Sequence, residues 1–277
     1  MIIDFRQLSI AMIADVRSLK TTKFRKEHQL FIAEGKKICN ELLKSDYEVR
    51  FIIVNKDNIN DLDMQSLIND FNQKQINIYV TSNSKFVNLC DADTPQGILA
   101  VVKMKFPPIT STTNTSNSNI SLTSNASFVA LDNISDPGNV GTIIRTAEWF
   151  GIEQILLIGD CANQYNPKVV RSSMGSIFRT KIINLDNSTD ILNNTFKNFD
   201  NSNNFNIFAA SLDATKILQD IKPTKPFGLI VGNESRGIST FLNEIITQKF
   251  LIAGNGNAES LNVGIAAGIA LYHLCGN

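Results

Sequence analysis

The sequence predicts an α/β protein with two domains, and three observations support this. Short apolar runs typical of buried strands alternate with segments of helical apolar spacing along most of the 277 residues. This alternation stops at residues 110–127, where 15 of 18 residues are Ser, Thr or Asn. The length suffices for two domains of ordinary size. We therefore expect one domain over residues 1–105, a flexible linker over 106–127 and a second domain over 128–277.

The composition is that of a globular protein outside a membrane. Hydrophobic residues make up 43% and charged residues 19%. No apolar run is long enough to span a bilayer, and the first residues lack the pattern of a signal peptide, so we expect a cytoplasmic protein. The four cysteines and two histidines show no metal-ligand spacing. Reduced thiols and no bound metal are the expectation.

The first domain shows alternating helical and strand patterns. Helices are expected over residues 4–18, 36–44 and 62–74, and strands over 29–35, 50–54, 76–80 and 94–102. Such an alternation over about a hundred residues predicts a compact α/β unit.

The formal net charge is zero, which argues weakly against a nucleic-acid partner, but the charge is uneven along the chain. Residues 14–37 contain three acidic and seven basic side chains: Arg17, Lys20, Lys23, Arg25, Lys26, Lys36 and Lys37. This group is suited to following a phosphate backbone. An ordinary solvated helix and turn is the alternative interpretation.

The second domain begins with a βαβ pattern. An apolar strand at 128–131 leads through a turn into a helix over 139–150 and a strand at 154–158. Asn139 is a preferred N-cap residue, and Arg145 lies within the first two turns of the helix. A guanidinium and free backbone N–H groups can then face one anion, which favours a phosphate-bearing substrate. A simple βαβ turn with a surface arginine remains the alternative.

The rest of this domain continues as helix and strand. Helices are expected over 166–172, 190–199 and 262–274, and strands over 179–184, 205–210, 227–231 and 249–252. The last helix carries small residues on one face, including Gly264 and Gly268. Another helix can approach such a face closely, either within the chain or at a dimer interface.

Three stretches occur in order in the second domain: residues 139–147 (NVGTIIRTA), 230–238 (IVGNESRGI) and 252–263 (IAGNGNAESLNV). They resemble the signature motifs of the SpoU (TrmH-like) RNA ribose methyltransferases of the SPOUT superfamily. Residues 165–168 (YNPK) and 171–175 (RSSMG) also match the family pattern.

The first domain resembles a substrate-binding domain of the same family. Its residues 19–25, Glu34-Gly35 and Gln96-Gly97 are similar to the ribosomal-protein-like domain that precedes the catalytic domain in many SpoU enzymes. By that resemblance, this domain binds RNA.

The resemblance implies a mostly parallel sheet with a trefoil knot and a homodimer joined through the first-motif and last helices. It also implies S-adenosylmethionine as methyl donor and a ribose 2′-hydroxyl of RNA as acceptor. Ribosomal RNA is preferred over transfer RNA, because transfer-RNA members often lack the N-terminal domain. No metal and no membrane is implied.

The resemblance also assigns the site residues. The catalytic group would be Asn139, Arg145, Glu234, Ser260 and Asn262. Arg145 would bind the phosphate beside the target ribose, Glu234 would orient Arg145 or its loop, and Ser260 and Asn262 would cap the last helix or touch the ligands. The cofactor would lie against Gly232, Gly237, Ile238, Ile252, Gly254 and Leu261.

One departure and two alternatives accompany this interpretation. Ala253 and Gly254 stand where the family usually has Pro and then Met or a similar residue, which predicts a looser loop. This loop and the near-neutral charge motivate one alternative, a non-catalytic RNA-binding protein with the same fold. A transfer-RNA ribose methyltransferase is the other. A dehydrogenase is disfavoured, because no G-x-G-x-x-G follows a predicted strand.

Overall fold

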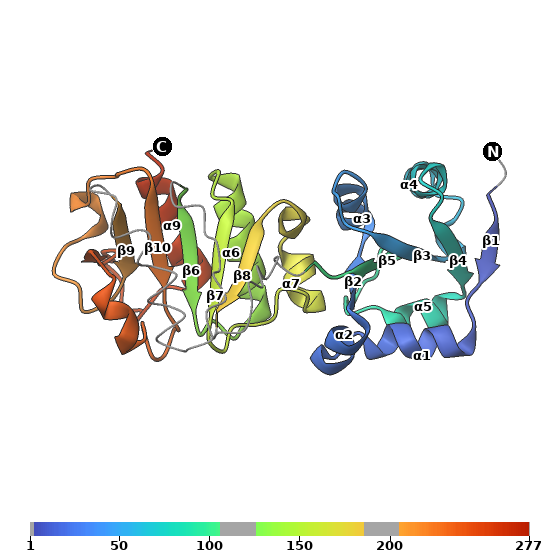
Figure 1. Ribbon diagram of the computed structural model, residues 1–277, viewed down its shortest axis with the longest axis horizontal. Coiled ribbons are helices and arrows are strands. Elements are labelled where there is room, and N and C mark those ends of the chain that lie inside the picture. The colour runs from blue at the N-terminus through green and yellow to red at the C-terminus, as the bar shows by residue number, and fades with distance from the viewer. Residues whose placement is uncertain (1–2, 106–125, 186–204, 277) are drawn as a thin grey trace, which may run out of the picture. The chain divides into compact units, whose positions relative to one another are not determined.

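The computed structural model describes residues 3–105, 126–185 and 205–276, and the chain forms two compact units (Figure 1). The first unit comprises residues 1–105 and 163–178, and the second comprises 106–162 and 179–277. The short segment 163–178, which the sequence places within the second domain, therefore packs with the first unit. Of the linker expected over 106–127, only Ala126 and Ser127 are described, and the helix expected over 190–199 lies outside the described residues.

The first unit is built on a mixed five-stranded sheet. Its strands are β1 (Phe5–Gln7), β2 (Leu30–Glu34), β3 (Val49–Asn55), β4 (Asn77–Thr81) and β5 (Ile98–Lys103). They lie in the order β1-β4-β3-β5-β2, and β5 runs antiparallel to both of its neighbours. Strand β5, which lies between β3 and the edge strand β2, is buried along most of its length, because helices cover both faces of the sheet.

The helices of this unit are α1 (Ile10–Ser18), α2 (Thr22–His28), α3 (Lys36–Leu43), α4 (Leu62–Gln73), α5 (Asn83–Leu89) and α7 (Pro167–Ser172). Figure 1 shows α3 and α4 on one face of the sheet and α1 and α5 on the other. Helix α4 buries Met64, Leu67, Ile68 and Phe71, which recur at helical spacing and form its inner face.

The helix expected over residues 4–18 is wrong in its first half. Strand β1 occupies Phe5–Gln7 and pairs in parallel with residues 78–80 of β4. Ser9 then caps α1, since its Oγ accepts a hydrogen bond from the Met12 N–H at 3.2 Å. Helices α2 and α5 were not predicted, because neither carries a long apolar stripe: Arg25 is the buried residue of α2.

The second unit contains a six-stranded sheet in which every described strand pair is parallel. Its strands are β6 (Phe128–Asp132), β7 (Gln154–Ile158), β8 (Lys181–Leu185), β9 (Asn206–Ala210), β10 (Phe227–Val231) and β11 (Gln248–Phe250), in the order β11-β9-β10-β6-β7-β8. Strands β6, β7 and β10 are fully buried, as expected for central parallel strands covered on both faces.

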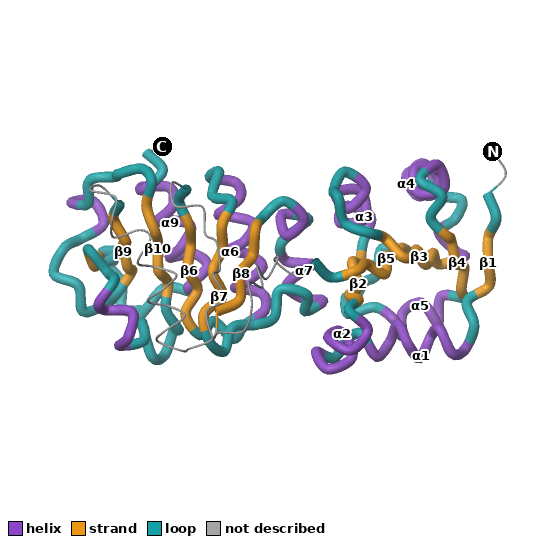
Figure 2. The backbone as a smooth tube through the Cα atoms, in the orientation of Figure 1, coloured by secondary structure: helices purple, strands orange, loops and turns teal. Residues whose placement is uncertain are grey.

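Two long helices, α6 (Pro137–Trp149) and α9 (Val263–Leu274), lie side by side in this unit (Figure 2). A Cβ at Gly264 would lie 3.4 Å from Thr142 Cγ2, and one at Gly268 would lie 3.7 Å from Thr146 Cγ2. The small face of α9 therefore packs on α6 of the same chain. Of the two uses expected for this face, the structure shows internal packing.

Short 3₁₀ turns complete the described chain: η1 (Lys56–Asn58), η2 (Ser176–Phe178), η3 (Leu218–Asp220) and η4 (Thr240–Glu244). None of the helices within the described ranges has the length and apolar character needed to cross a membrane.

Candidate active site

The candidate site lies where two neighbouring parallel strands end. Strands β6 and β10 are hydrogen-bonded to each other, and the loops that follow them carry the first and second sequence motifs. From β6 the chain proceeds through β7 and β8 on one side, whereas β10 lies on the other. The carboxyl ends of strands at such a change of direction form the usual binding crevice of parallel α/β sheets.

Asp136, and not Asn139, caps helix α6. The Asp136 Oδ1 accepts a hydrogen bond from the Asn139 N–H at 2.8 Å, and Pro137 occupies the first turn, where a missing N–H costs nothing. The expectation that Asn139 is the N-cap is therefore wrong. The consequence matters for the site, because the Asn139 side chain is left available for other partners.

Three of the expected site residues meet. The Asn139 Nδ2 donates to Glu234 Oε1 at 3.0 Å, and the Asn262 Nδ2 donates to Asn139 Oδ1 at 2.9 Å. A longer contact of 3.4 Å joins Asn262 Nδ2 to the same Glu234 oxygen. The first turn of α6, the loop after β10 and the N-cap of α9 are thus joined in one network, which we call the Asn-Glu-Asn cluster (Asn139, Glu234 and Asn262).

Asn262 also caps helix α9. Its Oδ1 accepts hydrogen bonds from the N–H groups of Gly264 at 2.9 Å and Ile265 at 3.3 Å. The Val263 N–H donates to Glu234 Oε1 at 3.3 Å, so a carboxylate lies at the positive end of the helix dipole. Both sides of the Asn262 amide are therefore used: the oxygen caps α9, and the nitrogen donates to the Asn-Glu-Asn cluster.

A buried carboxylate also links the chain after β6 to the chain after β10. Asp132 is fully buried and accepts hydrogen bonds from the Ser239 N–H at 2.6 Å, the Ser239 Oγ at 3.0 Å and the Asn133 Nδ2 at 2.7 Å. Asn233 adds a second link through its Nδ2, which donates to the Asn133 carbonyl at 2.9 Å. Sequence reasoning missed these four residues. The available signal was a polar residue at or just after the end of each apolar run, Asp132 directly after residues 128–131 and Asn233 two positions after Val231.

Gly232 allows the second motif loop to fold back on itself. Asn233 and Gly237 exchange two backbone hydrogen bonds of 3.0 and 2.9 Å. A Cβ at Gly232 would lie 2.5 Å from the carbonyl carbon and oxygen of Gly237, so no side chain fits there. Gly237 has φ of +67°, a left-handed value that favours glycine.

Comparison with known proteins shows the family. Residues 126–272 match the SpoU rRNA Methylase family, and residues 11–100 match a family described as the MRM3-like substrate binding domain. The chain is 30% identical over 266 residues to the 23S rRNA (guanosine(2553)-2′-O)-methyltransferase RlmP of Bacillus subtilis, covering 95% of this chain and 96% of that protein. The protein belongs to the SpoU rRNA methylase family.

Solved structures confirm the predicted fold class. A TrmH-family protein from Porphyromonas gingivalis is 29% identical, with a TM-score of 0.76 over 97% of this chain and 98% of that chain. An rRNA methyltransferase from Sinorhizobium meliloti is 24% identical, with a TM-score of 0.78 over 98% and 97% of the two chains, and shows the same fold. The similarity therefore includes the fold of the first unit as well as the fold of the second.

The structure joins three of the five expected catalytic residues and leaves two apart. Within the described residues, neither Arg145 nor Ser260 has a hydrogen bond or ion pair to the Asn-Glu-Asn cluster, and both side chains are exposed. Arg145 lies six positions beyond Asn139 in α6, about 9 Å further along the helix axis and on a different side. Glu234 accepts hydrogen bonds from Asn139 and the Val263 N–H, and among the described residues it makes no hydrogen bond or ion pair with Arg145.

Arg145 instead lines a hollow on the surface of the SpoU domain. The hollow has a volume of about 300 Å³, and Thr146 and Trp149 form the rest of its lining. Trp149, one turn after Arg145, is 83% exposed. A guanidinium beside a large exposed ring is suited to contact with another molecule.

Two of the residues expected to hold a cofactor, Gly254 and Leu261, lie in an exposed loop. The loop 253–262 is exposed, and no atom lies within 4 Å of a Cβ built on Gly254 or Gly256. Leu261, in the same loop, is 45% exposed, and Ile238 and Ile252 are half-buried. A flat, partly apolar ligand such as S-adenosylmethionine can lie against this loop. No cluster of three or more His, Cys, Asp or Glu that could hold a metal ion occurs in the described part of the chain.

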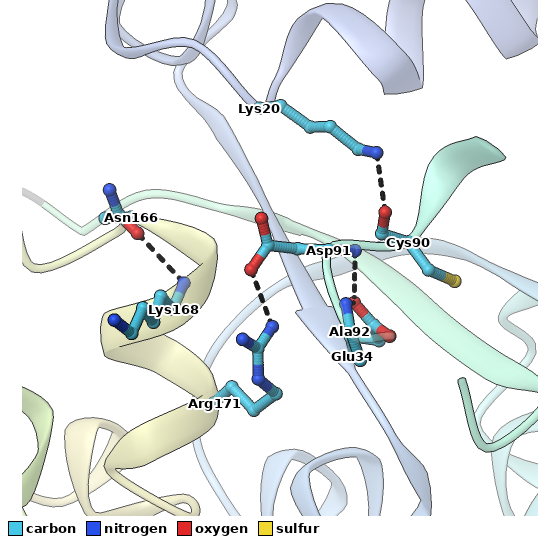
Figure 3. Close-up of polar contacts among 8 residues, drawn as sticks. All are labelled: Lys20, Glu34, Cys90, Asp91, Ala92, Asn166, Lys168 and Arg171. Atoms are coloured by element: carbon cyan, nitrogen blue, oxygen red, sulfur yellow. Dashed lines mark hydrogen bonds and ion pairs between the residues drawn. The ribbon is translucent and has the colours of Figure 1, made fainter. Parts of the chain in front are cut away.

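The family-pattern residues 165–175 belong to the first unit. Figure 3 shows Arg171 of α7 pointing at Asp91, with 2.6 Å between Arg171 Nη1 and Asp91 Oδ2. Glu34 Oε2 accepts a hydrogen bond from the Asp91 N–H at 2.8 Å. The Tyr165 hydroxyl accepts from the Lys105 N–H at 3.0 Å and donates to its carbonyl at 2.7 Å. These residues anchor segment 163–178 to the first unit.

Two members of the basic group over residues 14–37 have structural roles. Arg25 is fully buried and donates to the carbonyls of Leu19 and Lys20 at 3.1 and 2.8 Å, and burial lowers the pKa of its guanidinium. Lys20 donates to the Asn88 and Cys90 carbonyls at 3.0 and 2.6 Å, the second of which Figure 3 shows. The group offered to a ligand is therefore smaller than the sequence indicates.

Proposed function

We propose that this protein is an S-adenosylmethionine-dependent methyltransferase that modifies a ribose 2′-hydroxyl of RNA, most favourably in ribosomal RNA. The observation that carries the proposal is the Asn-Glu-Asn cluster, which joins the three motif loops of a SpoU family member. Membership of the family and the RlmP relative, named for 2′-O-methylation of 23S rRNA, support the reaction and the substrate class.

The residues of the chain would supply positioning and charge. S-adenosylmethionine, when bound, supplies a methyl group that is already activated by its sulfonium, so transfer needs an aligned acceptor oxygen rather than a metal. The Asn-Glu-Asn cluster holds the three loops in one geometry. Arg145 binds the phosphate beside the target ribose and stabilises charge on the 2′ oxygen. Because a guanidinium stays protonated, Arg145 does not act as the base, and the proton of the 2′-hydroxyl leaves through water or phosphate.

Ser260 and the cofactor residues complete the proposed site. Gly232, Gly237 and Ile238 would shape one side of the cofactor space, and Gly254 and Leu261 the other. Ser260 has an exposed side chain at the same loop, where its hydroxyl can contact ribose or cofactor. The trefoil knot of the SPOUT superfamily is part of this proposal for the second unit.

A homodimer is the assembly we propose, with the first unit as the RNA-binding part. The outer face of α6 and α9 carries large exposed apolar side chains: Trp149 at 83%, Ile265 at 56% and Tyr272 at 58%. This face is distinct from the small face of α9 that packs within the chain. A second copy covering it would bury these side chains and place Arg145 of each copy beside the interface.

Methyl transfer from labelled S-adenosylmethionine tests the proposal. Purified ribosomal RNA and transfer RNA are offered separately, and the ribose methyl is then located by mass spectrometry. We expect label in ribosomal RNA and its loss in Arg145→Ala, while RNA binding persists. Unlabelled RNA of both kinds, together with no binding of S-adenosylmethionine by calorimetry, would instead support a non-catalytic RNA-binding protein.

A further inference from the structure

A small hollow in the first unit has no role in the methyl-transfer site. Its volume is about 160 Å³, below the range of about 300–1,000 Å³ that drug-sized ligands need. Apolar side chains from α1 and the sheet form most of its lining, among them Met12, Leu19 and Phe51. Two polar side chains, Asp15 and His28, lie at the same hollow. Such a space is suited to a single planar ring system.

The two polar side chains are available to a ligand. Asp15 and His28 are both exposed, and within the described ranges neither side chain has a hydrogen bond or ion pair. The Asp15 backbone carbonyl accepts a hydrogen bond from Ser18 Oγ, but its carboxylate is unused. An ionised carboxylate accepts hydrogen bonds and donates none, so it selects a ligand that presents N–H groups.

An exposed aromatic pair continues from the hollow along α2. The rings of His28 and Phe24 are stacked, with 6.2 Å between their centroids and 11° between their planes. The Lys23 Nζ lies 5.9 Å from the centroid of the Phe24 ring, which itself is 37% exposed. Aromatic faces with cations beside them are the usual platform for unstacked bases of a single strand.

Exposed basic side chains lie along the same helix α2 and near the end of α1. Arg17, Lys23 and Lys26 are exposed, and no described residue pairs with their side chains in an ion pair. The buried Arg25 and the carbonyl-bound Lys20 are excluded from this set. These three cations, at one end of α1 and along α2, complement a phosphate backbone. A nucleic acid is favoured over an acidic protein segment, because the adjacent apolar hollow can accept a base ring.

We propose that the hollow binds one unpaired guanine base of an RNA strand whose phosphates lie on Arg17, Lys23 and Lys26. Guanine is the base that presents two adjacent N–H donors, N1 and N2, to one carboxylate. Adenine, cytosine and uracil each present a donor next to an acceptor, which Asp15 would repel. Phe51 and Leu19 contact the ring, and His28 extends the stack toward Phe24. The proposal rests on RNA being the substrate, and it adds a base-reading element in the first unit.

Binding of short RNA to the full-length protein tests this. Labelled uridine hexamers with one central G, A, C or U are titrated by fluorescence anisotropy. We expect the G-containing strand to bind about tenfold more tightly than the other three. Asp15→Asn should abolish this preference. The matched control is Asp63→Asn, which makes the same charge change on an exposed residue of α4, on the opposite face of the sheet.

A second variant tests the hollow itself. Met12→Trp fills the space and should weaken binding of the G-containing strand about tenfold, with an unchanged circular dichroism spectrum. Equal affinity for all four strands, or a guanine preference that survives Asp15→Asn, would overturn the proposal. Concentration-dependent self-association that Met12→Trp removes would instead assign the hollow to a second copy.

Failure of this inference and failure of the proposed function are separable. Methyl transfer to ribosomal RNA without a base preference in the hexamers leaves the function standing and removes the guanine site. A guanine preference without any methyl transfer would leave the guanine site standing and remove the proposed function.

Discussion

Asn139 and Asn262, which are 123 positions apart, are joined by a 2.9 Å hydrogen bond from Asn262 Nδ2 to Asn139 Oδ1. Each asparagine side chain also makes a second interaction: Asn139 donates to Glu234, and Asn262 caps α9. The first residues of two packed helices are therefore held by the same carboxylate. A substitution of Glu234 should therefore remove hydrogen bonds at the first turns of both α6 and α9.

Glu234→Ala tests that dependence. Removing the carboxylate leaves Asn139 Nδ2 and the Val263 N–H without their acceptor, and hydrogen bonds to charged groups contribute about 1.5–3 kcal/mol each. We expect kcat/KM for methyl transfer to fall about 10²-fold, and Glu234→Gln to lie between the variant and the wild type. The exposed Glu244→Ala is the control. An unaltered rate in Glu234→Ala would remove the cluster from the mechanism.

The buried Asp132 should matter for stability more than for chemistry. Asp132→Ala leaves the Ser239 N–H and Oγ and the Asn133 amide without their acceptor in a buried position. We expect the free energy of unfolding to fall by about 3 kcal/mol, measured by urea denaturation. Asp160→Ala, an exposed carboxylate after the neighbouring strand β7, should change it by less than about 0.5 kcal/mol. Equal losses in the two variants would contradict this role.

Much of the second unit was predictable because its signals are local. The apolar runs that became β6, β7 and β10 are short and continuous, as buried parallel strands require. The N-cap of α6 was misassigned because Asp136 and Asn139 are both good caps, three residues apart. The structure distinguishes the two residues, because the Asn139 side chain donates to Glu234 while Asp136 accepts from the Asn139 N–H.

Features that depend on distant partners could not be predicted. Strand β1 forms because residues 78–80 offer it an edge, and that pairing has no signal within residues 4–18. Arg25 looked like an RNA ligand by its charge, yet the carbonyls of Leu19 and Lys20 hold it inside. Segment 163–178 carries family-pattern residues, but its Arg171 finds its partner, Asp91, 80 positions away.

Two glycines should separate folding from cofactor binding. Gly254→Ala places a methyl group where no atom lies within 4 Å, so stability should be unchanged while affinity for S-adenosylmethionine falls about tenfold. Gly232→Ala forces a Cβ to 2.5 Å from the Gly237 backbone and should lower both. Calorimetric titration and urea denaturation measure the two quantities. Full affinity in Gly254→Ala would move the cofactor away from this loop.

The four thiols should be unreactive in the native protein at neutral pH. Burial raises the pKa of Cys161 to about 11, and burial also raises the pKa values of Cys39, Cys90 and Cys275. A thiol must ionise to react, so a thiol reagent at pH 7.5 should modify the urea-unfolded chain far faster than the native one. Rapid reaction of a native thiol would contradict this burial.

The same shifts predict how stability depends on pH. Because the native thiols hold their protons more tightly, this stabilisation is complete below the unfolded value of 9.0 and is lost as the pH rises toward 11. For Cys161 alone the loss should be about 2 kcal/mol. Urea denaturation at pH 8 and pH 10.5 measures it. Cys161→Ala should show a smaller decrease than the wild type, and an equal decrease would assign the effect elsewhere.

The last prediction concerns the outer face of α6 and α9. Trp149 is 83% exposed in one chain and is the single tryptophan of the sequence, so its fluorescence reports on this face alone. If a second copy covers it, emission should shift to longer wavelength on dilution, as the dimer dissociates and the ring meets water. Trp149→Glu should give a monomer by sedimentation and remove methyl transfer. Leu62→Glu, at an equally exposed apolar residue of α4, should leave the dimer intact. A monomeric wild type with full activity would show that one chain completes the site by itself.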